Sequence, residues 1–225
     1  HTGILGLGEN EAGETDGYDF KPVNTVVNAY HYRTLVLMEQ IAAVLGETED
    51  AEHYREASRQ LKKNFGKLLY DKEKGAYVDG IGSEHFSQHG NMFPLAFGLV
   101  DERQKDKVVD FVISRGMACS VYGAQFLLDA LYEANAADEA LNLMTSTGER
   151  SWYNMIRVGS TISLEAWDNK YKPNQDWNHA WGAAPANIIV RKLMGIEPLS
   201  PGYSKVRIFP QPATLEHASV KVPTV

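Results

Sequence analysis

The feature that most constrains the fold is a helical spacing of apolar residues that returns in pairs along the chain. From Val23 onward, apolar side chains recur at nearly 3.6-residue intervals as far as Gly46, and the pattern resumes after Thr48. Gly46 is a typical helix end and Thr48 a typical N-cap. Two long helices with so short a link are expected to pack antiparallel as a hairpin.

Further pairs follow without repeated signature residues. We expect helices over residues 86–99 and 101–115, over 119–134 and 136–147, and a last one over 180–194. An open helical solenoid would show a fixed sequence period, which we do not find. Uneven hairpins with long loops favour a closed α/α toroid, whose loops build a central pocket. The predicted fold class is therefore all-α, part of a toroid of antiparallel helix hairpins.

The two ends of the chain differ from this helical middle. Residues 1–21 are rich in Gly, Glu and Asp and are expected to form a loop or linker. Residues 205–209 alternate polar and apolar side chains, as a strand does. We therefore predict a helical domain over residues 22–197 and the start of a separate β domain over 198–225. Because the chain begins at His1 and stops in this strand-like stretch, we expect a piece of a longer protein.

Composition excludes several classes of function. The formal net charge is −7 and no basic patch is present, which argues against a nucleic-acid partner. No run of 18 apolar residues is found, so no membrane span is predicted. Cys119, the one cysteine, lies among apolar residues and is expected to be a packed thiol. Neither a metal-ligand spacing nor a phosphate-binding glycine motif occurs, so we predict no metal and no cofactor.

A cluster of tryptophans marks the candidate site. All four lie within about thirty residues, close to several acids and a histidine: Trp152, Trp167, Trp177, Trp181, Glu165, Asp168, Asp176 and His179. Sugars stack their apolar faces on aromatic rings and need polar partners for their hydroxyl groups, so a carbohydrate pocket requires this mixture. The alternative is that the tryptophans form core. Residues 148–178 show little helical period, which favours the pocket.

Several segments resemble one known family. Residues 159–168 (GSTISLEAWD) resemble the general-base segment of bacterial α-L-rhamnosidases, and residues 178–189 (NHAWGAAPANII) resemble the segment that follows it. Residues 88–91 (QHGN) are similar to a further family segment at a helix start. The stretch 195–203 resembles the exit from the catalytic barrel into a C-terminal β-sandwich. The resemblance covers about residues 22–225.

The resemblance implies a fold, a reaction and a set of site residues. The chain would be the second half of an (α/α)6 barrel in an inverting glycoside hydrolase that releases terminal α-L-rhamnose. Glu165 matches the general base. The matching substrate-binding residues are His179, Trp167, Trp181 and Asp168. Two positions depart from the family pattern: Leu164 stands where many members have tryptophan, and Val190 where proline is common.

An inverting glycosidase needs a second carboxyl as general acid. The resemblance places that acid on an earlier barrel segment, outside this chain. The acids near the N-terminus, Glu9, Glu11, Glu14 and Asp16, are expected to belong to a solvated loop. The isolated chain is therefore expected to be inactive on natural glycosides. Its expected partners are a rhamnosylated carbohydrate, the missing part of its own chain and, through uncovered apolar faces, further copies of itself. A periplasmic or extracellular location is implied by resemblance alone.

Two alternatives to this hypothesis stay open. A related toroid glycosidase could act on another sugar, such as α-L-fucose. A helical sugar-binding or interaction module would keep the tryptophans but would not need Glu165. Replacing Glu165 with Gln separates the classes, because only an enzyme would lose a general-base contribution of about 10²–10⁴ in rate.

Overall fold

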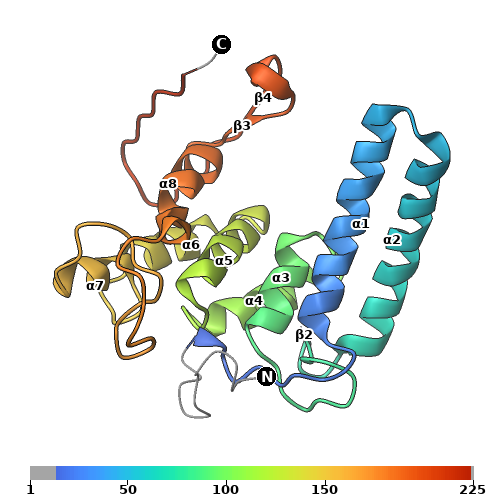
Figure 1. The fold of residues 1–225 in the computed structure, drawn as a ribbon, viewed down its shortest axis with the longest axis horizontal. Helices are drawn as coiled ribbons and strands as arrows, with labels where there is room; N and C mark the ends of the chain where they lie inside the picture. The colour runs from blue at the N-terminus through green and yellow to red at the C-terminus, as the bar shows by residue number, and fades with distance from the viewer. Residues whose placement is uncertain (1–13, 224–225) are drawn as a thin grey trace. The chain divides into compact units, whose positions relative to one another are not determined.

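The computed structural model describes residues 14–223, which form helical hairpins followed by short strands (Figure 1). The described residues divide into two compact units. One unit comprises residues 15–115 and the other residues 116–223 together with Glu14. The mainly helical class predicted from the apolar spacing is confirmed.

The unit of residues 15–115 begins with a long antiparallel hairpin of α1 (Thr25–Leu45) and α2 (Thr48–Leu69), seen side by side in Figure 1. Asn24 caps α1 by accepting a hydrogen bond from the backbone of Val27. Gly46 ends the helix with a φ of 82°, the left-handed conformation that favours glycine. The predicted N-cap at Thr48 is wrong, since Glu47 precedes α2 and Thr48 is its first residue.

A short β-hairpin and a second helix pair complete this unit. The strands are β1 (Tyr70–Asp71) and β2 (Ala76–Tyr77), which pair antiparallel. The helices α3 (His89–Ala96) and α4 (Lys105–Ser114) lie inside the ranges predicted for them but are shorter. Core side chains at the meeting of these elements are fully buried: Tyr77, Met92, Val108 and Val112.

The unit of residues 116–223 is built around α5 (Val121–Glu133), which α6 (Ala137–Thr145) follows after a short link. The helix α7 (Trp152–Arg157) lies in the stretch expected to be irregular, so that expectation is wrong at this point. The last predicted helix is broken into three parts. They are a 3-10 turn at Ala180–Ala183, α8 (Ala184–Ile188) and a π-helical turn at Ile189–Leu193.

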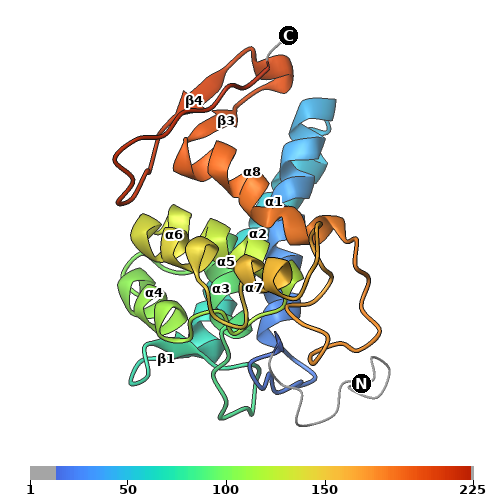
Figure 2. The same cartoon turned by 90° about the vertical axis from the view of Figure 1, so that its left-hand side faces the viewer.

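A two-stranded antiparallel ribbon follows α8 (Figure 2). The strand expected at residues 205–209 is present as β4 (Val206–Ile208), and it pairs with β3 (Ile196–Pro198), which the sequence did not indicate. Gly195 makes this pairing possible, because a Cβ atom there would lie 1.9 Å from the carbonyl oxygen of Phe209. A β-sandwich starting at residue 198 stays a prediction.

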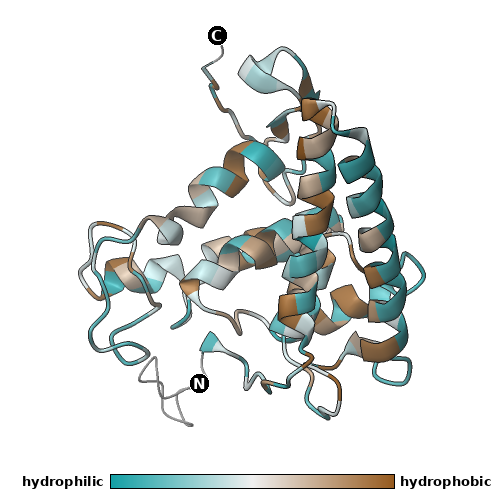
Figure 3. Cartoon of the chain, turned by 45° about the vertical axis from the view of Figure 1, so that its right-hand side comes forward, coloured by the Kyte–Doolittle hydropathy of each residue, from teal (hydrophilic) through white to brown (hydrophobic). Residues whose placement is uncertain are grey.

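Apolar residues recur along α1 as brown turns beside the mainly teal α2 (Figure 3), and several of their side chains are exposed. Val27 is 63% exposed, Val44 88% and Leu45 70%. Apolar surface of this kind favours association when it is extended. None of the described helices is long and apolar enough to cross a membrane.

Candidate active site around Glu165

Glu165 is held in place by backbone pairing between two irregular segments. Its amide donates to the carbonyl of Asp176 at 3.1 Å, and the amide of His179 donates to the carbonyl of Ser163 at 2.9 Å. The indole Nε1 of Trp181 donates to the carbonyl of Glu165 at 3.0 Å. Gly182 permits this close approach, since a Cβ atom there would lie 2.6 Å from Cβ of Ser163. The segments 163–165 and 176–182 therefore form one structural piece.

The carboxylate of Glu165 is nearly buried and has two partners. Its Oε1 is paired with the ammonium of Lys172, and its Oε2 accepts a hydrogen bond from the amide of Asp176 at 3.0 Å. The side chain is 12% exposed. The Lys172 ammonium, followed by the Asp176 amide, lowers the pKa of Glu165 below its ordinary value. Glu165 is therefore ionised at neutral pH, the state that a general base requires.

His179 and Trp181 form a stacked pair beside Glu165. Their ring centroids are 3.7 Å apart, with an angle of 20° between the ring planes. Nδ1 of His179 is buried and has no hydrogen-bond partner among the residues that the structure describes. A buried polar atom of this kind calls for a partner, and a ligand could supply one. Trp181 is 38% exposed and forms part of the wall of a pocket of about 490 Å³.

Trp167 and Asp168 have structural contacts that set them apart from Glu165, His179 and Trp181. Trp167 is fully buried, and its Nε1 donates to the carbonyl of Cys119 at 2.7 Å. Asp168 accepts a hydrogen bond from the side-chain amide of Asn154 at 2.9 Å, which is the main cause of its lowered pKa. The sugar-contacting role of both residues stays a prediction. In this arrangement they support the segment that carries Glu165.

Of the other two tryptophans, Trp152 packs against other residues and Trp177 lies at the surface. Trp152 packs edge-on against Trp167 at 5.0 Å, and its Nε1 donates to the carbonyl of Gly182 at 2.7 Å. Trp177 is 44% exposed. The cluster thus contains both core and surface tryptophans, so each of the two readings of the sequence pattern applies to part of it.

Glu14 is a residue of this site that sequence reasoning missed. Its Oε1 accepts a hydrogen bond from the amide of Trp167 at 3.3 Å. Burial raises its pKa above the ordinary value, against the opposing influence of the Trp167 amide, Arg150 and Lys172. The prediction that Glu14 is part of a solvated loop is therefore wrong. Glu9 and Glu11 lie outside the described residues. No local pattern could have indicated a contact across so much of the chain.

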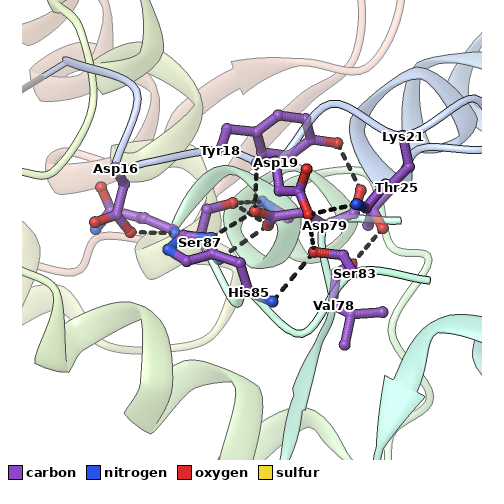
Figure 4. A network of polar contacts seen from close by, with 12 residues as sticks. Asp16, Tyr18, Asp19, Lys21, Thr25, Val78, Asp79, Ser83, His85 and Ser87 are labelled. Carbon is purple, nitrogen blue, oxygen red and sulfur yellow. Dashed lines mark hydrogen bonds and ion pairs between the residues drawn. The ribbon is translucent and has the colours of Figure 1, made fainter. Parts of the chain in front are cut away.

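A second cluster of acids and a histidine lies in the unit of residues 15–115 (Figure 4). Its centre is Asp79, whose side chain is fully buried. The carboxylate accepts hydrogen bonds from the amide and hydroxyl of Ser87 and from the amide of Asp19, and it contacts Nδ1 of His85 at 2.6 Å. The hydroxyl of Tyr18 donates to the Asp79 carbonyl at 2.9 Å. These contacts fasten residues 16–25 to the loop before α3.

Asp16 extends this second cluster. Its carboxylate accepts from the amide of Gln88 at 2.6 Å and is paired with the guanidinium of Arg115. The side chain is only 7% exposed, so the solvated-loop prediction is wrong here too.

Next to Gln88, burial lowers the pKa of His89 to about 4. Asn91 completes the QHGN segment by binding both backbone polar groups of Tyr77.

Over residues 14–223, no group of three or more His, Cys, Asp or Glu side chains is arranged to hold an ion. Cys119 is fully buried, as expected for a packed thiol.

Comparison with solved structures identifies the fold. The α-L-rhamnosidase from Dictyoglumus thermophilum matches with a TM-score of 0.72 at 22% identity over 82% of this chain and 21% of that chain. The GH78 family rhamnosidase of Bacillus sp. GL1 matches with a TM-score of 0.72 at 22% identity, over 90% of this chain and 24% of that one. The chain thus spans about a quarter or less of the length of these enzymes.

A third structure was determined with a sugar. The Streptomyces avermitilis α-L-rhamnosidase complexed with L-rhamnose matches with a TM-score of 0.68 at 22% identity, over 93% of this chain and 22% of that chain. No curated protein matches the sequence. The family model described as the bacterial alpha-L-rhamnosidase six-hairpin glycosidase domain matches residues 7–193. The chain therefore belongs to the bacterial α-L-rhamnosidase six-hairpin glycosidase family.

Proposed function

We propose that this chain carries the general-base half of an inverting glycosidase that releases terminal α-L-rhamnose. The observation that carries the proposal is the carboxylate of Glu165, kept ionised by Lys172 beside the stacked rings of His179 and Trp181. In an inverting reaction such a carboxylate takes a proton from the attacking water. His179 and Trp181 would contact the sugar through a ring nitrogen and an exposed ring face.

The substrate class in this proposal follows from family membership. The similar enzyme from Streptomyces avermitilis was solved with L-rhamnose bound. The Glu165 segment of this chain lies within the matched residues 7–193. A terminal α-L-rhamnosyl group is therefore the substrate to test first, with an α-L-fucosyl group as the competing sugar.

The general acid belongs, in this proposal, to another part of the full-length protein. A sugar leaving group must gain a proton as the bond breaks, and the acid supplies it. An activated aryl rhamnoside needs little protonation. We therefore expect the 225-residue chain alone to leave natural rhamnosides intact. Strong cleavage of a natural rhamnoside by this chain alone would place both carboxyls within it and direct attention to Glu14.

The test compares Glu165→Gln with the parent in the full-length gene product. We expect kcat on an aryl α-L-rhamnoside to fall by about 10²–10⁴ and KM to change little, because the variant keeps its shape and loses its base. Glu149→Gln is the matched control, since Glu149 is an exposed glutamate that pairs with Lys170 in the same unit. An unchanged kcat in Glu165→Gln would remove Glu165 from catalysis, whereas the absence of turnover in the parent would favour a binding module.

Two further readouts define the reaction. Proton NMR of the first product should show the anomer opposite to that of the substrate, as an inverting mechanism requires. A panel of aryl glycosides should show turnover of α-L-rhamnoside well above that of α-L-fucoside. Retained anomeric configuration would refute the inverting mechanism, and preference for fucoside would refute the sugar assignment.

A further inference from the structure

A lysine in the loop after Glu165 makes a contact that no sequence pattern indicated. Lys172 lies in the loop 168–176, and its ammonium is paired with Oε1 of Glu165. Lys170, two positions earlier, pairs instead with Glu149. The two lysines share one loop and differ in their partners, and Lys172 is the one that contacts the candidate base.

The backbone of this loop brings Lys172 back to the base. The amide of Lys172 donates to the carbonyl of Asp168 at 3.4 Å, and the amide of Gln175 donates to the carbonyl of Lys172 at 3.1 Å. The side-chain oxygen of Gln175 accepts from the amide of Ala166, the residue after Glu165, at 2.9 Å. The loop is therefore bonded to itself and to the base segment, so its fold fixes where the lysine begins.

The ion pair leaves Glu165 able to act as a base. Each carboxylate oxygen has two lone pairs. Oε1 uses one for the Lys172 ammonium, and Oε2 uses one for the amide of Asp176 at 3.0 Å. Counting its partners among the described residues, each oxygen keeps a lone pair for a water molecule. Two partners, one on each oxygen, hold the carboxylate in one orientation.

The groups around Glu165 make Lys172 the main influence on its protonation. The Lys172 ammonium, followed by the Asp176 amide, lowers the pKa of Glu165 against the opposing effect of burial, and the charge of His179 adds to the lowering. Glu14, the second carboxyl of this site, faces both Lys172 and Glu165. Glu165 is 12% exposed and Lys172 37%, so water screens this pair only in part.

We propose that Lys172 is a positioning residue of the reaction, which sets the lowest pH at which Glu165 works as the general base. With Lys172 in place, the carboxylate stays ionised as the pH falls, because its protonation would break the ion pair. Without Lys172, burial would favour the protonated carboxyl and the base would be lost at a higher pH. This inference rests on the proposed function, because it takes Glu165 to be the base.

The test is the pH dependence of kcat/KM for an aryl α-L-rhamnoside with the full-length gene product. This substrate needs little protonation of its leaving group, so the acid limb of the profile reports the base. In Lys172→Met the midpoint of the acid limb should move up by about one pH unit, because the opposite charge beside Glu165 is lost. Lys172→Gln should give the same shift, and Lys172→Arg, which keeps the charge, should keep the midpoint of the parent.

Lys170→Met is the matched control, because it removes the same charge from the same loop and leaves Glu165 paired. Its acid limb should coincide with that of the parent. The proposal would be overturned by an unmoved limb in Lys172→Met, by an equal shift in Lys170→Met, or by a shift in Lys172→Arg as large as that in Lys172→Met.

The role of Lys172 and the proposed function can fail separately. A loss of kcat in Glu165→Gln together with an unmoved acid limb in Lys172→Met would overturn the role of Lys172 alone. An unchanged kcat in Glu165→Gln would overturn the proposed function, and the role of Lys172 with it, whatever the lysine variants show.

Discussion

Two clusters in this chain combine carboxylates, histidines and aromatic rings, and they differ in how many partners the central carboxylate has. Asp79 is fully buried and accepts hydrogen bonds from Ser87 and Asp19 in addition to its contact with His85. Glu165 is 12% exposed and has Lys172 and one backbone amide as partners. Beside it, Nδ1 of His179 is buried and without a partner among the described residues.

The difference lies in the two carboxylates and not in the histidines, because Nδ1 of His89, next to Gln88 in the Asp79 cluster, is also buried without a partner among the described residues. A buried carboxylate that is saturated by backbone and hydroxyl donors holds segments together and has no capacity left for a ligand. The Glu165 carboxylate has only two partners, and the Trp181 indole beside it is 38% exposed, so this group retains capacity for a ligand. The residue types are similar in both places, so the number of partners of the central carboxylate, rather than composition, separates the structural network from the candidate site.

The largest expected effect on stability concerns Asp79. In Asp79→Ala, the Ser87 amide, the Ser87 hydroxyl and the Asp19 amide lose their acceptor inside the protein. Each unsatisfied buried donor costs about 1–3 kcal/mol, so the free energy of unfolding should fall by at least about 3 kcal/mol. Urea denaturation of the chain measures this, with Asp110→Ala, at an exposed aspartate on α4, as a control that should change little. A stable Asp79→Ala protein would contradict the structural role.

The next largest effect is the pH dependence of stability that His89 causes. Its folded-state pKa is about 4 because burial disfavours the charged ring. The unfolded chain binds a proton near pH 6.5, so stability should fall as the pH drops from about 6.5 to 4, by about 3 kcal/mol in total. Unfolding free energies at pH 7, 5.5 and 4.5 test this. His89→Phe should remove that part of the pH dependence, and an unchanged pH slope in the variant would contradict the assignment.

A smaller effect on stability should distinguish Trp167 from Trp181. Trp167→Phe removes the donor to the Cys119 carbonyl and should cost about 1–3 kcal/mol of stability. Trp181→Phe should change stability less and weaken the binding of L-rhamnose to the full-length gene product. Denaturation and calorimetry on both variants measure the two effects. The reverse pattern would mean that Trp167 contacts the sugar and Trp181 serves the core.

The smallest effect concerns association through α1. The exposed side chains of Val44 and Leu45 should favour self-association of the isolated chain. Light scattering over a range of concentrations should show an average mass above that of one chain. Val44→Lys with Leu45→Lys should lower it. A monomer at high concentration in the parent would refute this prediction.

The helices could be predicted because their signal is local. Apolar spacing together with stops such as Gly46 defines α1 and α2 within a few residues. The helix α7 was missed because residues 152–157 are too few to show a period. The sequence did not show that the last helix changes from a 3-10 turn to α8 and then to a π-helical turn, because the apolar pattern continues through all three parts.

The site was predictable only in part. Resemblance to a family indicated Glu165, His179 and Trp181, which the structure brings together. The alternative that the tryptophans are core did not say that Trp167 would be the buried one, and the burial of Glu14 could not be foreseen because its contact joins two distant segments. Glu14 meets Trp167 across 153 positions of the chain, and no spacing rule describes such a pair.

The most direct test of the account compares Glu165→Gln and Asp79→Asn in the full-length gene product, each measured for kcat on an aryl α-L-rhamnoside and for unfolding free energy. The account predicts that Glu165→Gln lowers kcat by about 10²–10⁴ and leaves stability nearly unchanged. Asp79→Asn should lower stability, while the molecules that remain folded keep their kcat. Loss of stability without loss of kcat in Glu165→Gln would contradict the account, because Glu165 would then be a structural residue like Asp79.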